Sequence, residues 1–135
     1  MKHKIKIQLR YSDSDQMGVV YHGNYFSFFE QGRTDMLKAY GINYYDIEQK
    51  GYVFPVRDVD CTYFQSIKLG ETIYCETIIK NISKVRIDFE HTIVNDKNEI
   101  KAKGHSSIIS VQKDTFGIVK LDQHLPEVYN IKDKI

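Results

Sequence analysis

Residues 24–41, NYFSFFEQGRTDMLKAYG, carry the strongest structural signal in the chain. Large apolar side chains recur there at helical spacing: Tyr25, Phe29, Met36 and Tyr40. Asn24 is a typical N-cap residue, and Gly41 stands where a left-handed C-terminal cap belongs. The pattern predicts a helix over residues 25–40, and no other segment is long enough to form a central helix.

The segments on either side of this helix have different periods. Residues 4–11 alternate in polarity, which predicts a half-buried strand with its apolar face formed by Ile5, Ile7, Leu9 and Tyr11. Residues 12–24 are rich in Asp, Ser and Gly and are predicted to form a loop. A second, shorter helix is expected over residues 44–50, opened by Asn43 and closed by Gly51.

The rest of the chain is predicted to form strands joined by short turns. The expected strands cover residues 53–64, 71–82, 85–93, 100–113 and, as a short last one, 117–121, followed by a polar tail. Pro55 makes the first of them irregular, and Gly104 marks a bulge or a close approach. Short connections imply antiparallel pairing. We therefore expect one α+β domain over residues 1–135, an antiparallel sheet of five or six strands wrapped around one long central helix.

Composition limits the function classes. The chain has 19 basic and 18 acidic residues and a formal net charge of +1, which argues against binding to nucleic acid or to an anionic membrane surface. No apolar run approaches the roughly 20 residues that span a bilayer, and the N-terminus lacks the apolar centre of a signal peptide. A cytoplasmic protein is expected, with Cys61 and Cys75 as reduced thiols.

The loop before the long helix holds the candidate chemistry. Residues 10–25 read RYSDSDQMGVVYHGNY and place Asp13 and Asp15 just ahead of a helix start. Backbone N–H groups at a helix start are unpaired and can stabilise an oxyanion, and a nearby carboxylate can act as nucleophile or general base. Bracing of a turn is the competing interpretation of both carboxylates.

This segment resembles the signature of the 4-hydroxybenzoyl-CoA thioesterase family, and the chain is most similar to the bacterial acyl-CoA thioesterases associated with the Tol-Pal system. The matching elements are Asp15, two residues and Gly18, then Val-Val-Tyr-His at 19–22, Asn-Tyr at 24–25, Phe-Glu at 29–30 and Arg33. The resemblance implies a hotdog fold, hydrolysis of acyl-CoA thioesters, and a homodimer or homotetramer with its sites at the dimer interface.

The resemblance also implies roles for single residues. Asp15, three residues before Gly18, is the expected catalytic carboxylate, with Asp13 as a supporting loop residue. A backbone N–H near His22 is expected to polarise the thioester carbonyl. The His22 imidazole either orders water, contacts substrate or pairs with Asp15, or else caps the helix or faces a tyrosine. Three further residues are candidates for the substrate pocket, with helix capping as the alternative for the last: Gly18, Tyr21 and Asn24.

Two further sets of charged residues bear on the predicted site. Glu30 is a rival acid on the helix, but Arg33 lies three residues later at ion-pair spacing, so we expect a structural pair. The CoA phosphates need cations, and the candidates are Lys84, Arg86 and Lys113, either as ordinary solvated residues or reaching a neighbouring subunit's site.

The expected reaction needs no cofactor, because CoA is part of the substrate. A thiol leaving group with a pKa of about 8.5 departs with little acid assistance. The five histidines show no metal-ligand spacing, so no metal site is predicted. The alternatives are hydrolysis of acyl carrier protein thioesters, a hydroxyacyl dehydratase, for which the helix lacks the needed His and acid, and a non-catalytic acyl-thioester binder.

Overall fold

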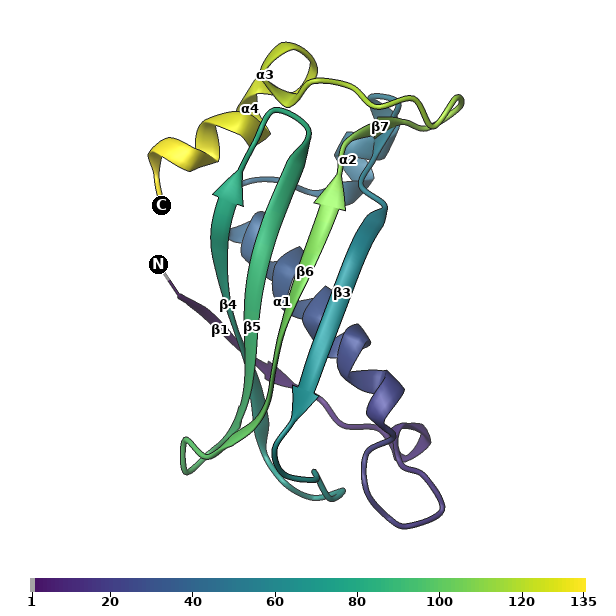
Figure 1. The fold of residues 1–135 in the computed structure, drawn as a ribbon, viewed down its shortest axis with the longest axis vertical. Coiled ribbons are helices and arrows are strands. Elements are labelled where there is room, and N and C mark those ends of the chain that lie inside the picture. The colour runs from purple at the N-terminus through teal and green to yellow at the C-terminus, as the bar shows by residue number, and fades with distance from the viewer. Residues whose placement is uncertain (1) are drawn as a thin grey trace.

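The computed structural model describes residues 2–135 (Figure 1). Its helices are α1 (Tyr25–Ala39), α2 (Tyr44–Gln49), α3 (Leu121–His124) and α4 (Pro126–Tyr129), with 3₁₀ turns η1 (Tyr11–Asp13), η2 (His22–Asn24) and η3 (Asn130–Asp133). Its strands are β1 (His3–Ile7), β2 (Tyr52–Val53), β3 (Val56–Tyr63), β4 (Ile73–Ile82), β5 (Arg86–Asn95), β6 (Ile100–Ile109) and β7 (Val111–Gln112). The long helix, the short second helix and the predicted strands up to residue 113 are confirmed, except that residues 53–64 are divided between β2 and β3 and residues 100–113 between β6 and β7.

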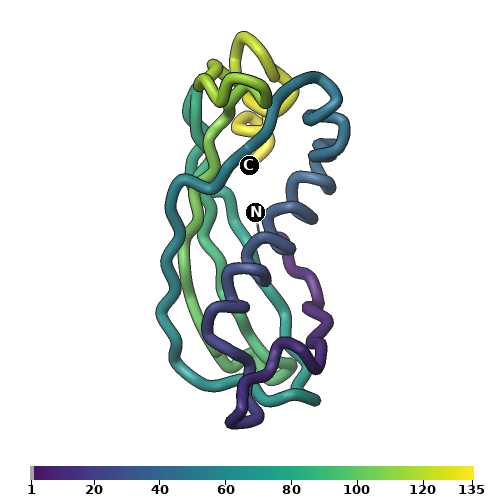
Figure 2. Tube along the Cα trace, turned by 90° about the vertical axis from the view of Figure 1, so that its right-hand side faces the viewer, coloured from purple at the N-terminus to yellow at the C-terminus, as the bar shows by residue number. Residues whose placement is uncertain are grey.

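The main sheet has five strands in the order β1-β4-β5-β6-β3, and every neighbouring pair is antiparallel. Figure 2 shows the sheet and α1 as two layers, with the helix running along one face of the curved sheet. The core lies between them, and its largest fully buried side chains include Phe28, Phe29, Met36 and Leu37 of α1. The predicted sheet around a central helix is therefore confirmed.

Two glycines let the helix lie close to the sheet. A Cβ at Gly32 of α1 would stand 2.5 Å from Thr77 Oγ1 and 2.8 Å from Cys75 Sγ, both on β4. A Cβ at Gly104 of β6 would stand 2.6 Å from Cε2 of Phe29. The close approach predicted at Gly104 is therefore confirmed, and it fixes how deeply α1 sits against the sheet.

A buried polar chain crosses this helix–sheet contact. His91 is fully buried. Its Nδ1 lies 3.0 Å from Thr77 Oγ1, and its Nε2 lies 2.8 Å from Ser106 Oγ. Arg33, only 5% exposed, donates from Nη1 to the same Ser106 hydroxyl at 3.3 Å. The predicted ion pair between Glu30 and Arg33 is wrong. Glu30 is exposed, whereas the Arg33 side chain is buried against the sheet, and no ion pair between them occurs within residues 2–135.

The first strand ends earlier than predicted. β1 stops at Ile7, and Tyr11 is 87% exposed in η1 rather than on the apolar face of a strand. The cause is local, because the Asp13 carboxylate accepts a hydrogen bond from the Arg10 backbone N–H at 2.8 Å and closes the turn.

The C-terminal segment was also predicted incorrectly. In place of a strand over residues 117–121, Ile118 makes one isolated bridge to Val111, and the chain then forms α3, α4 and η3. The side chains that anchor these short helices are fully buried: Leu121, Leu125, Val128 and Ile131. The tail thus closes one end of the core.

Among residues 2–135, no helix combines the length and apolar character that crossing a membrane requires.

Candidate active site

The Asp15 carboxylate is held by a tight loop built on its own neighbours. The Asp15 N–H donates to the Val19 carbonyl at 2.8 Å, and Gly18 turns the chain with a φ of +79°. Oδ1 of Asp15 accepts from the Met17 N–H at 2.8 Å and from the Val19 N–H at 3.4 Å. Oδ2 accepts no hydrogen bond from residues 2–135 and is therefore available to a reactant. The structure gives Gly18 this turn-forming role.

Asp13, two residues earlier, is buried and fully engaged. Its Oδ2 and Oδ1 accept from the backbone N–H and Nη2 of Arg10 at 2.8 and 3.1 Å. Its carbonyl accepts from the Tyr21 N–H at 2.8 Å and from Asn24 Nδ2 at 2.9 Å. This geometry supports Asp13 as a supporting residue that ties the carboxylate loop to the helix start.

The start of the long helix is open. The 3₁₀ turn η2 runs directly into α1, and among residues 2–135 the N–H groups of His22 and Gly23 have no acceptor. The expected capping role of Asn24 is wrong, because its amide donates to Asp13 and makes no cap hydrogen bond. Two unpaired donors therefore remain where the partial positive charge of the helix is concentrated.

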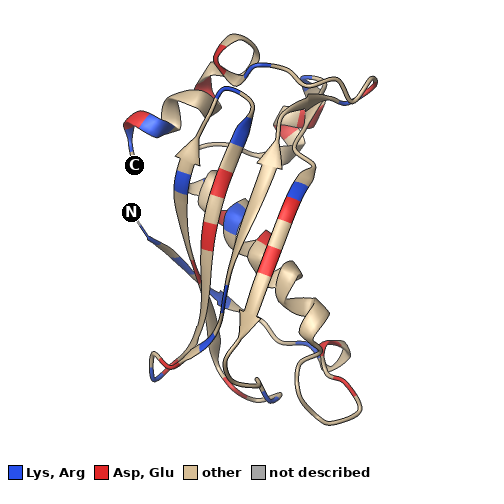
Figure 3. Cartoon of the chain, viewed as in Figure 1, with Lys and Arg blue, Asp and Glu red and all other residues tan. Residues whose placement is uncertain are grey.

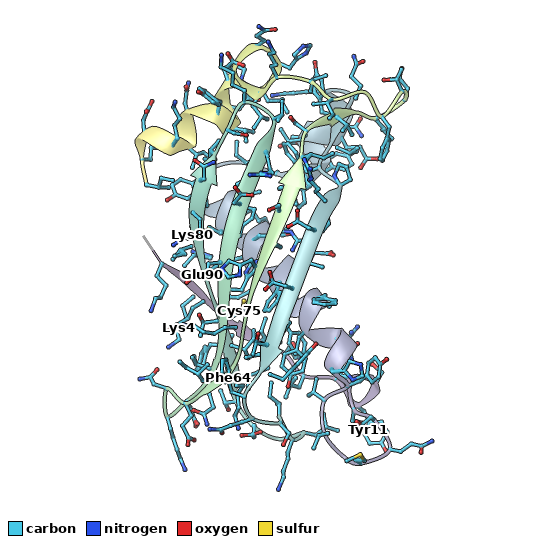
Figure 4. The ribbon with its side chains drawn as sticks, viewed as in Figure 1. Lys4, Tyr11, Phe64, Cys75, Lys80 and Glu90 are labelled. Carbon is cyan, nitrogen blue, oxygen red and sulfur yellow. The ribbon has the colours of Figure 1, made fainter. Side chains whose placement is uncertain are left out.

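Asp15 and His22 line one open cavity of about 290 Å³ at this end of the molecule. The lining residues come from the loop, from α1 and from the chain after β3: Asp15, Val19, Val20, His22, Tyr25, Tyr63, Phe64, Gln65 and Ser66. Figure 4 shows Phe64 and Tyr11 at the same end of the molecule. Tyr21 and Asn24 do not line the cavity, although the Tyr21 ring packs on the His22 ring with centroids 4.4 Å apart.

The wall from Tyr63 to Ser66 was not predicted from the sequence. It lies about 40 residues beyond the loop and reaches the cavity only because α1 crosses the sheet next to β3. The available signal was an aromatic pair, Tyr63 and Phe64, at the end of a strand.

Desolvation shapes the protonation of the aromatic wall. Burial raises the pKa of Tyr25 to about 12, and desolvation also raises the pKa of Tyr63 to about 12. Both phenols are therefore neutral hydrogen-bond donors at physiological pH.

The cations predicted to bind phosphate lie at the other end of the sheet. Lys84 and Arg86 are in and after the β4–β5 turn, far from the loop of Asp15 in Figure 1. Each faces an acid: Lys84 Nζ is 4.0 Å from Asp122, Arg86 Nε is 3.0 Å from Asp88, and Lys113 Nζ is 2.7 Å from Glu48. Figure 3 shows acidic and basic residues interspersed over the sheet. Within one chain, these cations do not join the Asp15 cavity.

An antiparallel sheet wrapped around one long central helix is the architecture of the hotdog fold. The sequence model described as the thioesterase superfamily matches residues 17–102, and the chain belongs to this superfamily. The match begins after Asp15 and does not include that carboxylate.

Relatives and solved structures agree with the family assignment. The Bacillus subtilis protein named "Putative acyl-CoA thioesterase YneP" is 34% identical over 131 residues, covering 97% of this chain and 95% of its own. An acyl-CoA thioester hydrolase of Escherichia coli, YbgC, is 27% identical over 105 residues, 78% of each chain. The structure of a DHNA-CoA thioesterase from Staphylococcus aureus has a TM-score of 0.94 and 33% identity, covering 98% of this chain and 89% of its own.

Proposed function

We propose that this chain hydrolyses acyl-CoA thioesters to a carboxylic acid and CoA. The observation that carries the proposal is that Asp15, which has one unengaged carboxylate oxygen, and His22, whose backbone N–H is unpaired at the open start of the helix, line the same cavity. The names of the relatives in Bacillus subtilis and Escherichia coli support the same substrate class.

The chemistry follows from these two groups. The Asp15 carboxylate either attacks the thioester carbonyl or removes a proton from the water that attacks it. The N–H groups of His22 and Gly23 stabilise the negative charge that develops on the carbonyl oxygen. The C–S bond then breaks, and the CoA thiolate leaves and is protonated. If water attacked, the acid forms directly; if Asp15 attacked, the resulting mixed anhydride is hydrolysed by water, which releases the acid and restores the carboxylate. The reaction consumes only water, and the exposed His22 imidazole has the role of ordering it.

An aromatic acyl group is the substrate class that we propose first. The cavity wall carries three aromatic rings, Tyr25, Tyr63 and Phe64. The Staphylococcus aureus structure with 33% identity is described as a DHNA-CoA thioesterase. The motif between Tyr11 and Arg33 supports kinship with the 4-hydroxybenzoyl-CoA and Tol-Pal-associated enzymes.

A homodimer is part of the proposal. Within residues 2–135, β3 is the last strand of the main sheet, most of its side chains are exposed, and its outer edge has no partner strand. Antiparallel pairing of two β3 edges would continue the sheet and cover exposed Val56, Tyr63 and Phe64. It would also turn the basic β4–β5 end of one copy toward the Asp15 end of the other, which is how Lys84 and Arg86 could serve a neighbouring site.

The free thiols of Cys61 and Cys75 support a cytoplasmic location.

A hydrolysis screen tests the function. The purified protein is assayed for thiol release from short, long and aromatic acyl-CoA thioesters, with the same acyl groups on acyl carrier protein compared in parallel. We expect the highest kcat/KM for an aromatic acyl-CoA. Saturable binding of these thioesters without any thiol release would instead identify a non-catalytic binder, and a preference for the carrier protein would reassign the substrate.

A further inference from the structure

Tyr63 makes the contact that joins the sheet to the open helix start. It is the last residue of β3, and its hydroxyl donates to the His22 carbonyl at 2.7 Å, across 41 positions of sequence. Its ring meets the Tyr25 ring edge-on, with centroids 4.8 Å apart, which holds the phenol in place. Neither the loop of Asp15 nor α1 supplies this hydrogen bond.

The accepting carbonyl lies between the two unpaired donors. The His22 C=O shares its residue with one free N–H and shares its peptide unit with the other, that of Gly23. Because a peptide unit is planar, anchoring the carbonyl also fixes the direction of the Gly23 N–H. The same carbonyl already accepts from the Tyr25 N–H, and a second donor polarises the peptide further, by about 10–30% per bond in cooperative chains.

The absence of a side chain at Gly23 lets the ring of Tyr21 pack against the helix start. A Cβ at Gly23 would stand 2.7 Å from Cε2 of Tyr21, so any larger residue at position 23 would displace the Tyr21 ring. The helix start is thus contacted by the Tyr63 hydroxyl at the His22 carbonyl and by the ring of Tyr21 at Gly23.

We propose that Tyr63 is a positioning residue, which sets the orientation and donor strength of the backbone N–H groups at residues 22 and 23 through its hydrogen bond to the His22 carbonyl. This inference rests on the proposed function, because it assigns those N–H groups to the thioester oxygen. The Tyr63 phenol has a pKa of about 12, so it stays protonated, and therefore remains a hydrogen-bond donor, throughout the pH range of an assay.

The variant Tyr63→Phe removes the hydroxyl and keeps the ring. We expect kcat to fall about 10-fold with KM unchanged within about 2-fold, because the lost interaction acts on charge that develops in the transition state. The matched control is Tyr52→Phe, which removes the hydroxyl hydrogen bond to His124 Nδ1 (2.9 Å) away from the Asp15 cavity, and it should leave kcat unchanged.

A second readout does not depend on activity. In ¹⁵N-labelled protein, Tyr63→Phe should move the Gly23 amide resonances upfield, because its peptide loses one hydrogen bond at the carbonyl. An unshifted Gly23 amide, or a wild-type kcat in Tyr63→Phe, would overturn the positioning role while leaving the thioesterase proposal intact. A wild-type protein that hydrolyses no thioester would overturn both.

Discussion

Two carboxylates in one loop differ because of what each one contacts. Asp13 is buried, and both of its carboxylate oxygens accept hydrogen bonds from Arg10, which closes the turn. Asp15 is partly exposed on the cavity, and the loop uses only its Oδ1. The same residue type therefore serves structure at one position and is free for chemistry two residues later.

The side chain and the backbone of residue 22 can be separated by one substitution. His22→Ala keeps the backbone N–H and removes only the exposed imidazole. We expect kcat to fall about 10-fold or less, which is below the range of about 10²–10⁴ for one general acid–base group. Steady-state assays on the best acyl-CoA measure this. A loss as large as that of Asp15→Asn would make the imidazole an essential group.

At this scale the sequence predicted part of the site. Asp15 and His22 lie on the cavity as expected, because both belong to one local segment whose pattern resembles a known family. The place of Tyr63 on the cavity was not predicted, because its contact with the His22 carbonyl joins distant parts of the chain and no local pattern records it. Asn24 was interpreted as a cap or a ligand, and its contact with the Asp13 carbonyl depends on the fold of the preceding loop.

At the scale of elements, the helix–sheet contact depends on Gly32. Replacement by alanine gains up to about 1 kcal/mol of helix propensity. However, the new methyl group would overlap Thr77 Oγ1 and Cys75 Sγ, and overpacking of a core costs about 1–3 kcal/mol. We expect the overpacking to outweigh the helix propensity, so that Gly32→Ala lowers the free energy of unfolding by up to about 2 kcal/mol, as measured by urea denaturation.

Ser27→Ala is the control on the exposed face of the same helix, and its free energy of unfolding should change by no more than about 0.5 kcal/mol. A Gly32→Ala variant more stable than the wild type would show that α1 can move away from the sheet without cost.

The elements themselves were predictable where one periodicity ran unbroken. The helix at 25–39 and the strand at 86–95 were found because their buried residues recur at steady steps. The C-terminal helices were missed because each spans only four residues, too short to display a period. Leu121 and Leu125 in this segment are buried because they pack against the end of the core, a contact that the sequence pattern does not reveal.

At the scale of the whole molecule, the buried His91 couples stability to pH. Desolvation, with the charge of Arg33 and His105, lowers its pKa from 6.5 to about 3. Between these values the unfolded chain binds a proton that the folded protein excludes. His91 therefore stabilises the fold fully above pH 6.5, and this contribution falls by about 1.4 kcal/mol per unit as pH drops toward 3.

Urea denaturation between pH 7 and pH 4 measures this slope. In His91→Gln the dependence of the free energy of unfolding on pH should flatten by about one proton across that window. Equal slopes in His91→Gln and the wild type would place the proton uptake elsewhere.

The free edge of β3 leads to a prediction about assembly. We expect a solution mass of at least twice the 15.8 kDa of one chain, because pairing at this edge satisfies its backbone groups and covers exposed apolar side chains. Light scattering after size exclusion gives the mass. On dilution, activity per chain should fall together with the mass, and a fully active monomer would contradict a site shared between copies.

The kcat of Asp15→Asn on the best acyl-CoA substrate, compared with that of Asp13→Asn, tests the assignment of the catalytic carboxylate most directly. Asparagine preserves the size of either side chain but removes its charge and its capacity to act as nucleophile or base. The account predicts a loss of roughly 100-fold or more for Asp15→Asn in a folded protein, with much of the activity kept in Asp13→Asn. Equal losses in the two variants, or an active Asp15→Asn enzyme, would contradict it.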